Sequence, residues 1–323
     1  MNGESSRLHL ISDIGGTKTR FALVRAGDAP ADVAVLHNRD HSSLAEEAKA
    51  YLAQSNAGEP PSAAAFSIAC PIEGDQVTLT NFDWSFSIEG LRRELGVDRL
   101  EVVNDFTAIA LSLPHLKAGD LDKIGGDEPV PNAPIGLIGP GTGLGVSGLI
   151  HCAGGWKALQ CEGGHVTLPT TTMRESHVYE ILKSHFDDVS AERAVSGPGL
   201  VNLYEALSEI EGKPAERLEP REVAERASNG SDPISSEAAR MFSAILGTVS
   251  GDLALTLGAK GGVYIGGGVV RNMGPAFDRE AFRKRFEAKG RLRSFVAPIP
   301  VYLITYRWPG LMGLSHLLAD PPA

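Results

Sequence analysis

The sequence has 323 residues, 42% of them hydrophobic, and a formal net charge of −10. This length can form one large core or, more comfortably, two. The acidic balance and the lack of a Lys/Arg block argue against a nucleic-acid interface and against a polybasic membrane patch. We therefore expect a small-molecule partner, with no nucleic acid and no membrane.

The cysteine content argues against a disulfide framework and a structural zinc site. Cys70, Cys152 and Cys161 are an odd, widely spaced set without a Cys-x-x-Cys pair. The first apolar run, residues 8–11, is too short for the core of a signal peptide. We expect a reducing, cytoplasmic environment and no dedicated metal-ligating cluster.

The first predicted element is a hairpin. Residues 8–11 and 21–24 are apolar runs on either side of a double glycine, which is typical of two strands joined by a turn. Ser43 and Glu46 then have the spacing of a capping box, which predicts a helix to about Gln54.

The hairpin turn has the composition of a phosphate-binding loop. Backbone amides, a hydroxyl and an ammonium lie around glycines that add little bulk, and a carboxylate precedes them as a possible Mg²⁺ ligand. An ordinary turn with a solvated lysine is the alternative. The candidate residues are Asp13, Ile14, Gly15, Gly16, Thr17 and Lys18.

Two further strands and a short helix follow the first helix. Residues 64–68 and 77–80 are predicted as strands, and residues 87–95 as a helix that ends at Gly96, where a left-handed turn is easily adopted. Residues 100–103 are predicted as a buried strand.

A polar pair, Asn104 and Asp105, lies between that strand and an apolar helical stretch, residues 106–113. Ligands bind at the carboxyl ends of strands in open α/β sheets. The amide could bind a hydroxyl group, and the carboxylate could accept its proton during phosphoryl transfer. The alternative is that Asp105 is simply the N-cap of the helix.

The second half of the chain repeats the opening pattern. Residues 135–138 and 146–150 flank the glycine-rich segment 139–145, which predicts a second hairpin and two related α/β lobes. The backbone of Gly141, Thr142 and Gly143 could wrap an anion. The segment runs into a strand and not a helix, so it is not a dinucleotide fingerprint, and no Walker A loop occurs.

Four helices are predicted next, and then a strand with a glycine turn. The long helix at 235–257 is apolar enough to cross a core. The helices are residues 175–185, 199–210, 221–227 and 235–257, and the strand, residues 263–265, is followed by Gly266, Gly267 and Gly268.

A carboxylate and an imidazole, Glu162 and His165, flank a glycine pair and could hold vicinal sugar hydroxyls. A polar hairpin is the alternative for this segment. Glu192 is a further candidate, although a Glu beside Arg near a helix start is usually just solvated.

Taken together, these motifs resemble bacterial glucokinase in order and spacing from about residue 8 to about residue 313. The residues that carry the resemblance are Asp13-Ile14-Gly15-Gly16-Thr17, Asn104-Asp105-Phe106-Thr107-Ala108, Gly141-Thr142-Gly143-Leu144-Gly145, Glu162-Gly163-Gly164-His165, Ser190-Ala191-Glu192-Arg193, Ser196-Gly197-Pro198-Gly199 and Gly266-Gly267-Gly268.

The resemblance implies a two-lobed, actin-like (ribonuclease H-like) α/β fold with the active site in a cleft. We expect a small domain of residues 1–114 with 306–323 and a large domain of residues 115–305. The resemblance also implies a homodimer, with ATP and Mg²⁺ as cofactors and phosphorylation of glucose at the 6-hydroxyl.

The resemblance also assigns residue roles. Asp105 is the general base, and the sugar is held by Asn104, Asp105, Glu162, His165 and Glu192. The loops at 13–17 and 139–145 take the phosphates, and residues 266–268 lie by the adenosine.

Two departures from the family pattern concern the first loop, where Ser12 replaces a glycine and Lys18 an asparagine. The zinc motif of a related kinase and repressor group is absent after His165, so the chain resembles the zinc-free branch. A kinase for another hexose, such as mannose or N-acetylmannosamine, and a non-catalytic sugar-sensing regulator remain alternatives.

Overall fold

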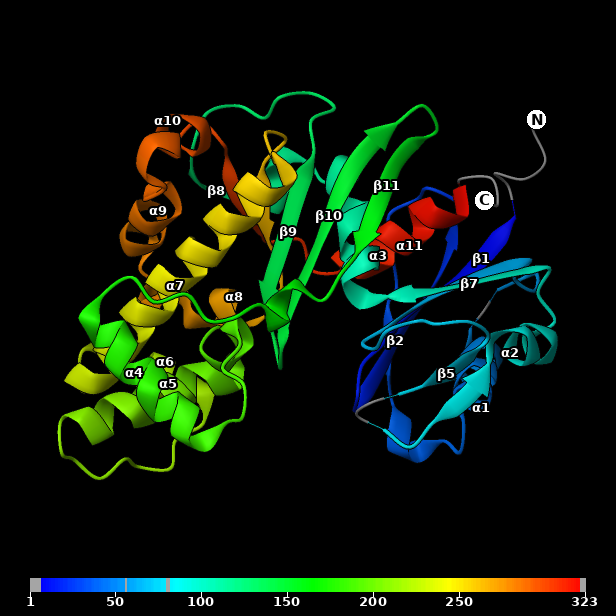
Figure 1. The fold of residues 1–323 in the computed structure, drawn as a ribbon. Coiled ribbons are helices and arrows are strands. Elements are labelled where there is room, and N and C mark those ends of the chain that lie inside the picture. Colours follow the sequence, from blue (N-terminus) through cyan, green and yellow to red (C-terminus); the bar gives the residue numbers. More distant parts are fainter. Residues whose placement is uncertain (1–6, 56, 80–81, 320–323) are drawn as a thin grey trace. The chain divides into compact units, whose positions relative to one another are not determined.

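The computed structural model describes residues 7–55, 57–79 and 82–319. The chain divides into two compact units. Unit 1 comprises Met1–Lys117 and Tyr306–Ala323, and unit 2 comprises Ala118–Thr305. Each unit is an α/β structure with its own mixed sheet (Figure 1), so the predicted fold class is confirmed.

The sheet of unit 1 has the strand order β3-β2-β1-β4-β7. β1 pairs antiparallel with β2, as the predicted hairpin requires, and parallel with β4, which is parallel to β7. β7 is an edge strand and is half-buried, so the prediction of a buried strand there was wrong. The strands are β1 (Leu8–Ile14), β2 (Lys18–Arg25), β3 (Ala34–His37), β4 (Ala63–Ile68) and β7 (Arg99–Asn104).

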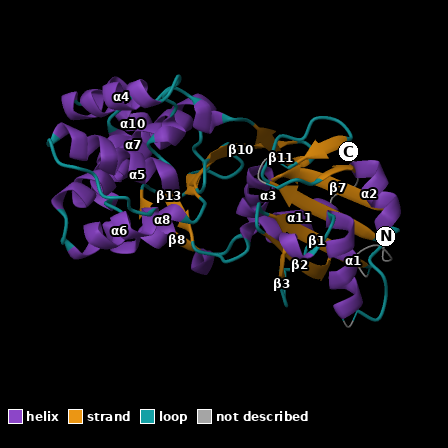
Figure 2. Cartoon of the chain, turned by 90° about the horizontal axis from the view of Figure 1, so that it is seen from below, coloured by secondary structure: helices purple, strands orange, loops and turns teal. Residues whose placement is uncertain are grey.

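Helices cover both faces of this sheet, because alternate residues of its strands point to opposite sides. Leu10 packs in a core with residues of α1 and α2, whereas Ile11 packs with residues of α3 and α11. Figure 2 shows the sheet together with these four helices. The helices are α1 (Leu44–Gln54), α2 (Ile88–Leu95), α3 (Asp105–Ser112) and α11 (Pro309–Ala319). The sequence analysis missed α11 and β3.

A small sheet of β5 (Gln76–Thr78) and β6 (Ser85–Ser87) completes unit 1. The strand predicted at 77–80 corresponds to β5, which starts one residue earlier. Residue 80, the last of the predicted strand, lies outside the described residues. Short 3-10 helices occur at Asn38–Asp40 and Leu113–His115.

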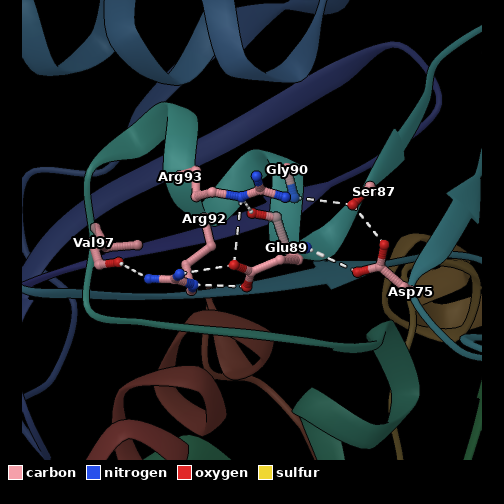
Figure 3. A network of polar contacts seen from close by, with 7 residues as sticks. All are labelled: Asp75, Ser87, Glu89, Gly90, Arg92, Arg93 and Val97. Atoms are coloured by element: carbon pink, nitrogen blue, oxygen red, sulfur yellow. Dashed lines mark hydrogen bonds and ion pairs between the residues drawn. The ribbon is translucent and has the colours of Figure 1, made fainter.

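Side-chain caps fix where α1 and α2 begin. Ser43 accepts the amide hydrogen bond of Glu46, but the Glu46 carboxylate reaches back to the amide of Ser42 and not to that of Ser43, so the capping box is displaced by one residue. At α2, Ser87 caps Gly90 and donates to Asp75 (Figure 3).

The far end of α2 is fixed as well. Arg92 forms two hydrogen bonds with Glu89 and donates a third to the carbonyl of Val97, beyond the helix. Gly96 ends the helix in the left-handed conformation, as predicted. The chain therefore enters β7 from a fixed point.

The sheet of unit 2 repeats the order of unit 1 and adds an edge strand, giving β11-β10-β9-β12-β13-β8. β9 pairs antiparallel with β10 and parallel with β12, as β1 does with β2 and β4. The prediction of two related α/β lobes is confirmed at the level of strand order. The strands are β8 (Leu121–Gly125), β9 (Ile135–Pro140), β10 (Leu144–Cys152), β11 (Gly155–Gln160), β12 (Val263–Ile265) and β13 (Val301–Ile304).

The helices of unit 2 pack around α7, which supplies much of the core. The four predicted helices are confirmed as α4 (Met173–His185), α5 (Gly197–Ile210), α6 (Pro220–Asn229) and α7 (Pro233–Leu257), and α8 (Val269–Met273), α9 (Arg279–Glu287) and α10 (Arg293–Val296) were not predicted. Short 3-10 helices occur at Ala118–Asp120, Gly163–His165, Ala191–Arg193, Gly274–Ala276 and Gly290–Leu292. Among the described residues no helix is both long and apolar enough to span a bilayer.

The packing of α11 on α3 predicts an asymmetry between two glycines of one helix. A Cβ on Gly313 would lie 1.8 Å from the carbonyl oxygen of Ala108, whereas a Cβ on Gly310 would meet ordinary contacts at 3.9 Å and beyond. We expect Gly313→Ala to lower the free energy of unfolding by about 1–3 kcal/mol, as overpacking does. Gly310→Ala should be neutral or slightly stabilising.

Denaturant titration of both variants measures these changes. Equal stability of the two variants would contradict the close approach of α11 to α3.

Candidate active site

The carboxylate of Asp13 is held on both sides by neighbouring strands. Asp13 lies one residue from the end of β1, opposite Arg20 on β2 and Ser67 on β4. Arg20 donates to Oδ2 at 2.9 Å, and the Ser67 hydroxyl donates to Oδ1 at 3.0 Å. The guanidinium of Arg20 also lies 5.7 Å from the ring centre of Trp308. Sequence analysis missed Arg20 and Ser67.

The turn after Asp13 joins β1 to β2 tightly. The amide of Gly15 donates to the carbonyl of Lys18 at 3.1 Å. Ile14 is buried, Gly15 and Gly16 are half-buried, and Thr17 and Lys18 are exposed. The turn therefore presents its backbone and the two exposed side chains to solvent.

Asn104, and not Asp105, is the N-cap of α3, so the alternative reading of Asp105 as the cap was wrong. The backbone of Asn104 is still extended, and its Oδ1 accepts from the amides of Phe106 and Thr107. Its Nδ2 donates to the carbonyl of Cys70 at 3.4 Å. Asp105 is the first helical residue, and its Oδ1 accepts from the amide of Phe106 at 2.9 Å.

In unit 1 the loop after β1 and the start of α3 both lie at the carboxyl ends of parallel strands, on one side of the sheet. Ile14 is level with Ile68, which is level with Asn104. The loop after β1 and the start of α3 are thus separated by one strand, or about 10 Å at the usual spacing. Cys70 lies two residues beyond the end of β4. Burial raises its pKa, and the charge of Asp105 raises it further.

The second hairpin turn is closed by its own backbone. The amide of Gly141 donates to the carbonyl of Gly143 at 2.8 Å, and the carbonyl of Gly141 accepts from the amide of Gly197 at the start of α5. Thr142 is exposed at the tip. The first turn of α5 therefore packs directly on this loop.

The segment from Glu162 to His165 forms a 3-10 turn, and not the polar hairpin considered as its alternative. The side chains of Glu162 and His165 are exposed. The backbone of this turn lies against the start of β10, where a Cβ on Gly164 would be 1.9 Å from the carbonyl oxygen of Leu144.

Glu192 is bonded and not merely solvated. Its Oε2 accepts from the amide of Leu144 at 2.9 Å, so it ties the 3-10 helix at 191–193 to the second hairpin. Leu144 therefore joins three candidate segments, because its carbonyl is also packed against Gly164. The partners are 48 positions apart, and no local pattern in the sequence signals the contact.

The turn at 266–268 reaches the same hairpin from the other side. The amide of Gly266 donates to the carbonyl of Ile138 at 2.8 Å. Gly267 has a φ of +78°, and a Cβ there would lie 2.3 Å from the carbonyl oxygen of Pro140. A Cβ on Gly268, which precedes α8, would make only an ordinary contact at 3.7 Å with Nδ2 of Asn272. The candidate residues of unit 2 thus converge on one hairpin.

A protein-family model described as glucokinase matches residues 10–321. The chain is 52% identical over 310 residues to the glucokinase of Aromatoleum aromaticum, covering 96% of this chain and 94% of that one. The chain belongs to the glucokinase family.

Solved structures of the glucokinase family share the fold. The glucokinase of an Antarctic psychrotroph has a TM-score of 0.90 at 32% identity and covers 98% of this chain and 99% of its own. A ROK family glucokinase from Streptomyces griseus, in complex with glucose and AMPPNP, has a TM-score of 0.65 at 20% identity over 96% of this chain and 98% of its own. The expected two-lobed, actin-like fold is confirmed.

Unit 2 has two pockets that are lined by residues outside the predicted glucokinase site. One of about 670 Å³ is lined by residues of α6, α7 and the segment 274–279, and one of about 300 Å³ by residues of α4 and α5 and the loop after α5. No predicted site residue lines either of them. Among the described residues no group of three or more His, Cys, Asp or Glu side chains could hold a metal.

The contact of Glu192 with Leu144 can be tested through Gly143. A Cβ on Gly143 would lie 2.5 Å from Oε2 of Glu192. A Cβ on Gly141 would have its nearest neighbour, the carbonyl oxygen of Gly143, at 4.0 Å. Gly143→Ala should displace the carboxylate and release the Leu144 amide. Hydrogen bonds to charged groups contribute about 1.5–3 kcal/mol, so exchange of that amide should accelerate about 10- to 100-fold.

Amide hydrogen exchange followed by NMR gives the rate, and Gly141→Ala is the matched control. An unchanged exchange rate of the Leu144 amide in Gly143→Ala would show that the bond to Glu192 does not protect this amide.

Proposed function

We propose that this chain transfers the terminal phosphoryl group of ATP to the 6-hydroxyl of glucose. The observation that carries the proposal is the carboxylate of Asp105 at the start of α3, on the same sheet edge as the glycine loop after β1, in a chain of the glucokinase family. The glucose and AMPPNP bound by the Streptomyces griseus relative support both substrates, since AMPPNP is an analogue of ATP.

Asp105 is the proposed general base. It accepts the proton of the sugar 6-hydroxyl as that oxygen attacks the terminal phosphorus, and the bond from this phosphorus to the bridging oxygen of ADP breaks. Asn104 already caps α3, so Asp105 is not needed to start the helix. It lies in the first turn of α3, where the partial positive charge of a helix N-terminus interacts favourably with a carboxylate.

The sugar clamp is proposed from both units. Asn104 retains one Nδ2 hydrogen beyond its bond to Cys70, and Glu162 and His165 are exposed on a turn whose backbone is fixed by Leu144. Glu192 uses Oε2 for Leu144, which leaves Oε1 for a sugar hydroxyl.

The two glycine loops are proposed to hold the phosphates, and residues 266–268 to lie by the adenosine. Mg²⁺ supplies neutralisation of phosphate charge when bound, and it usually keeps several waters and takes one or two carboxylates. Asp13 fits this need, because each of its oxygens accepts one hydrogen bond and keeps further acceptor capacity. Exposed Lys18 is proposed to approach the phosphates.

The wider organisation is also part of the proposal. Unit 1 and unit 2 correspond to the small and large domains, with boundaries expected near residues 114 and 305, and the working enzyme is a cytoplasmic homodimer. A kinase for mannose or N-acetylmannosamine is the second candidate, since clamp residues define hydroxyl spacing poorly. ADP release measured with a panel of sugars distinguishes the two, and turnover with none of them would leave a sugar-sensing regulator.

Asp105→Ala tests the general base. We expect kcat to fall about 10²- to 10⁴-fold, which is the usual contribution of a positioned base. The fold should persist, because Asn104 still caps α3. Glucose-dependent ADP release measures kcat, and thermal unfolding checks the fold.

The control is Asp75→Ala, which removes a carboxylate from the start of α2 in the same unit. Its turnover should stay at the wild-type level. Wild-type kcat in Asp105→Ala would overturn the assignment.

His165→Ala tests the sugar clamp. Loss of one hydrogen bond to the sugar should raise the KM for glucose about 2- to 10-fold while the KM for ATP stays unchanged. The control is His177→Ala, an exposed imidazole on α4. An unchanged glucose KM in His165→Ala would exclude this residue from the clamp.

A further inference from the structure

A fully buried asparagine outside the predicted site holds the glycine loop of unit 1. Asn38 is the first residue after β3, and its side chain has no exposed surface. Its Nδ2 donates to the carbonyl of Gly15 at 2.8 Å, and its backbone amide donates to the carbonyl of Thr17 at 3.1 Å. Two carbonyls of the four-residue turn are therefore fixed by one residue.

The contact extends the pairing of β2 with β3 beyond the last strand residues. Lys18 is level with His37, so Asn38 lies beside the turn itself. The partners Asn38 and Gly15 are 23 positions apart in the sequence. Neither a glycine pattern nor a strand pattern marks this residue.

The amide of Asn38 can take only one orientation. Buried Thr19 donates its hydroxyl to Oδ1 at 3.2 Å, which leaves Nδ2 for the carbonyl of Gly15. Glu47 of α1 is also fully buried, and burial raises its pKa. Neither of its carboxylate oxygens has a hydrogen-bond partner among the described residues, so the single hydroxyl hydrogen of Thr19 is donated to Asn38.

The planarity of the peptide bond gives these contacts a consequence. In a trans peptide the C=O of one residue and the N–H of the next point in opposite directions. Holding the carbonyl of Gly15 towards Asn38 thus directs the N–H of Gly16 away from the protein interior. That N–H is a donor in the turn where the phosphates of the nucleotide are proposed to bind.

We propose that Asn38 is a positioning residue for nucleotide binding, which fixes the peptide plane between Gly15 and Gly16 so that the Gly16 N–H faces the phosphates. This inference rests on the proposed function. Without the Asn38 side chain the carbonyl of Gly15 would lose its buried donor, and the plane could rotate at the glycine, while the backbone bond from Asn38 to Thr17 would remain. The effect should fall on ATP and not on glucose.

Asn38→Asp is the sharpest test, because it keeps the size of the side chain and replaces the donor by a carboxylate. The charged form would face the carbonyl of Gly15, and we expect the KM for ATP to rise about tenfold, equivalent to about 1.4 kcal/mol. Protonation restores an O–H donor. Because burial raises the pKa of a carboxyl group, the KM for ATP should recover towards the wild-type value as the pH is lowered from 8 to 5.5.

Titratable or charged groups near this position include Glu47, Asp40 and His41, the chain neighbours His37 and Arg39, and Lys18 across from His37. Their contribution is removed by measuring the wild type over the same pH range. Ser112→Ala is the control for loss of a buried hydrogen bond in unit 1, since its hydroxyl bonds only along α3 to Ile109. It should leave the KM for ATP and its pH profile unchanged.

A second pair of variants covers a failure of Asn38→Asp to fold. Thr19→Val removes the hydroxyl that orients the side-chain amide of Asn38 and should raise the KM for ATP. Thr19→Ser keeps the hydroxyl, so its KM for ATP should stay close to the wild-type value. A pH-independent, wild-type KM for ATP in folded Asn38→Asp, or equal effects of Val and Ser at position 19, would overturn the inference. Absence of glucose-dependent turnover in the wild type would instead count against the proposed function.

Discussion

The backbone N–H and C=O of Leu144 make the contacts on which the candidate site of unit 2 depends. Its N–H donates to Glu192, and its C=O is so close to Gly164 that a side chain there would overlap it. One residue at the start of β10 therefore sets the positions of the 3-10 turn with Glu162 and His165 and of the segment with Glu192. Leu144 is paired with Pro140 of β9, and β10 is paired on both sides from Ser147 onwards, so the strand that carries these groups is fixed in position.

The two units use the same strand order but hold their glycine hairpins by different means. In unit 2 backbone groups make several of these contacts, including the amide of Gly197 and the close approach of Gly267, and Glu192 adds one side-chain contact. In unit 1 two side chains take part, with Asn38 on the carbonyl of Gly15 and Arg20 on the preceding carboxylate. A backbone contact tolerates many side chains, whereas a side-chain contact depends on the identity of one residue.

The sequence predicts those features that depend on neighbouring residues. Glycine-rich segments between apolar runs predicted both hairpins, and Gly96 predicted the end of α2, because caps act within one helical turn. Contacts between distant segments leave no such pattern, which is why the roles of Arg20, Asn38 and Leu144 were missed. The cap of α3 was assigned one residue too late, since Asn and Asp are equally good caps and only the backbone angles separate them.

The net charge of −10 raises the question of how this chain could bind an anionic nucleotide. Charges are screened beyond about 8 Å at physiological ionic strength, so the distant carboxylates matter little. Nearby, the carboxylate of Asp13 is paired with Arg20 at 2.9 Å, and two unit charges at about 4 Å interact by about 4 kcal/mol at an effective dielectric constant of 20. A triphosphate at the first hairpin, where we propose that it binds, would therefore meet a neutralised pair and not an isolated carboxylate. The orientation of the hairpin amides then matters more for the proposed binding than the overall charge of the chain.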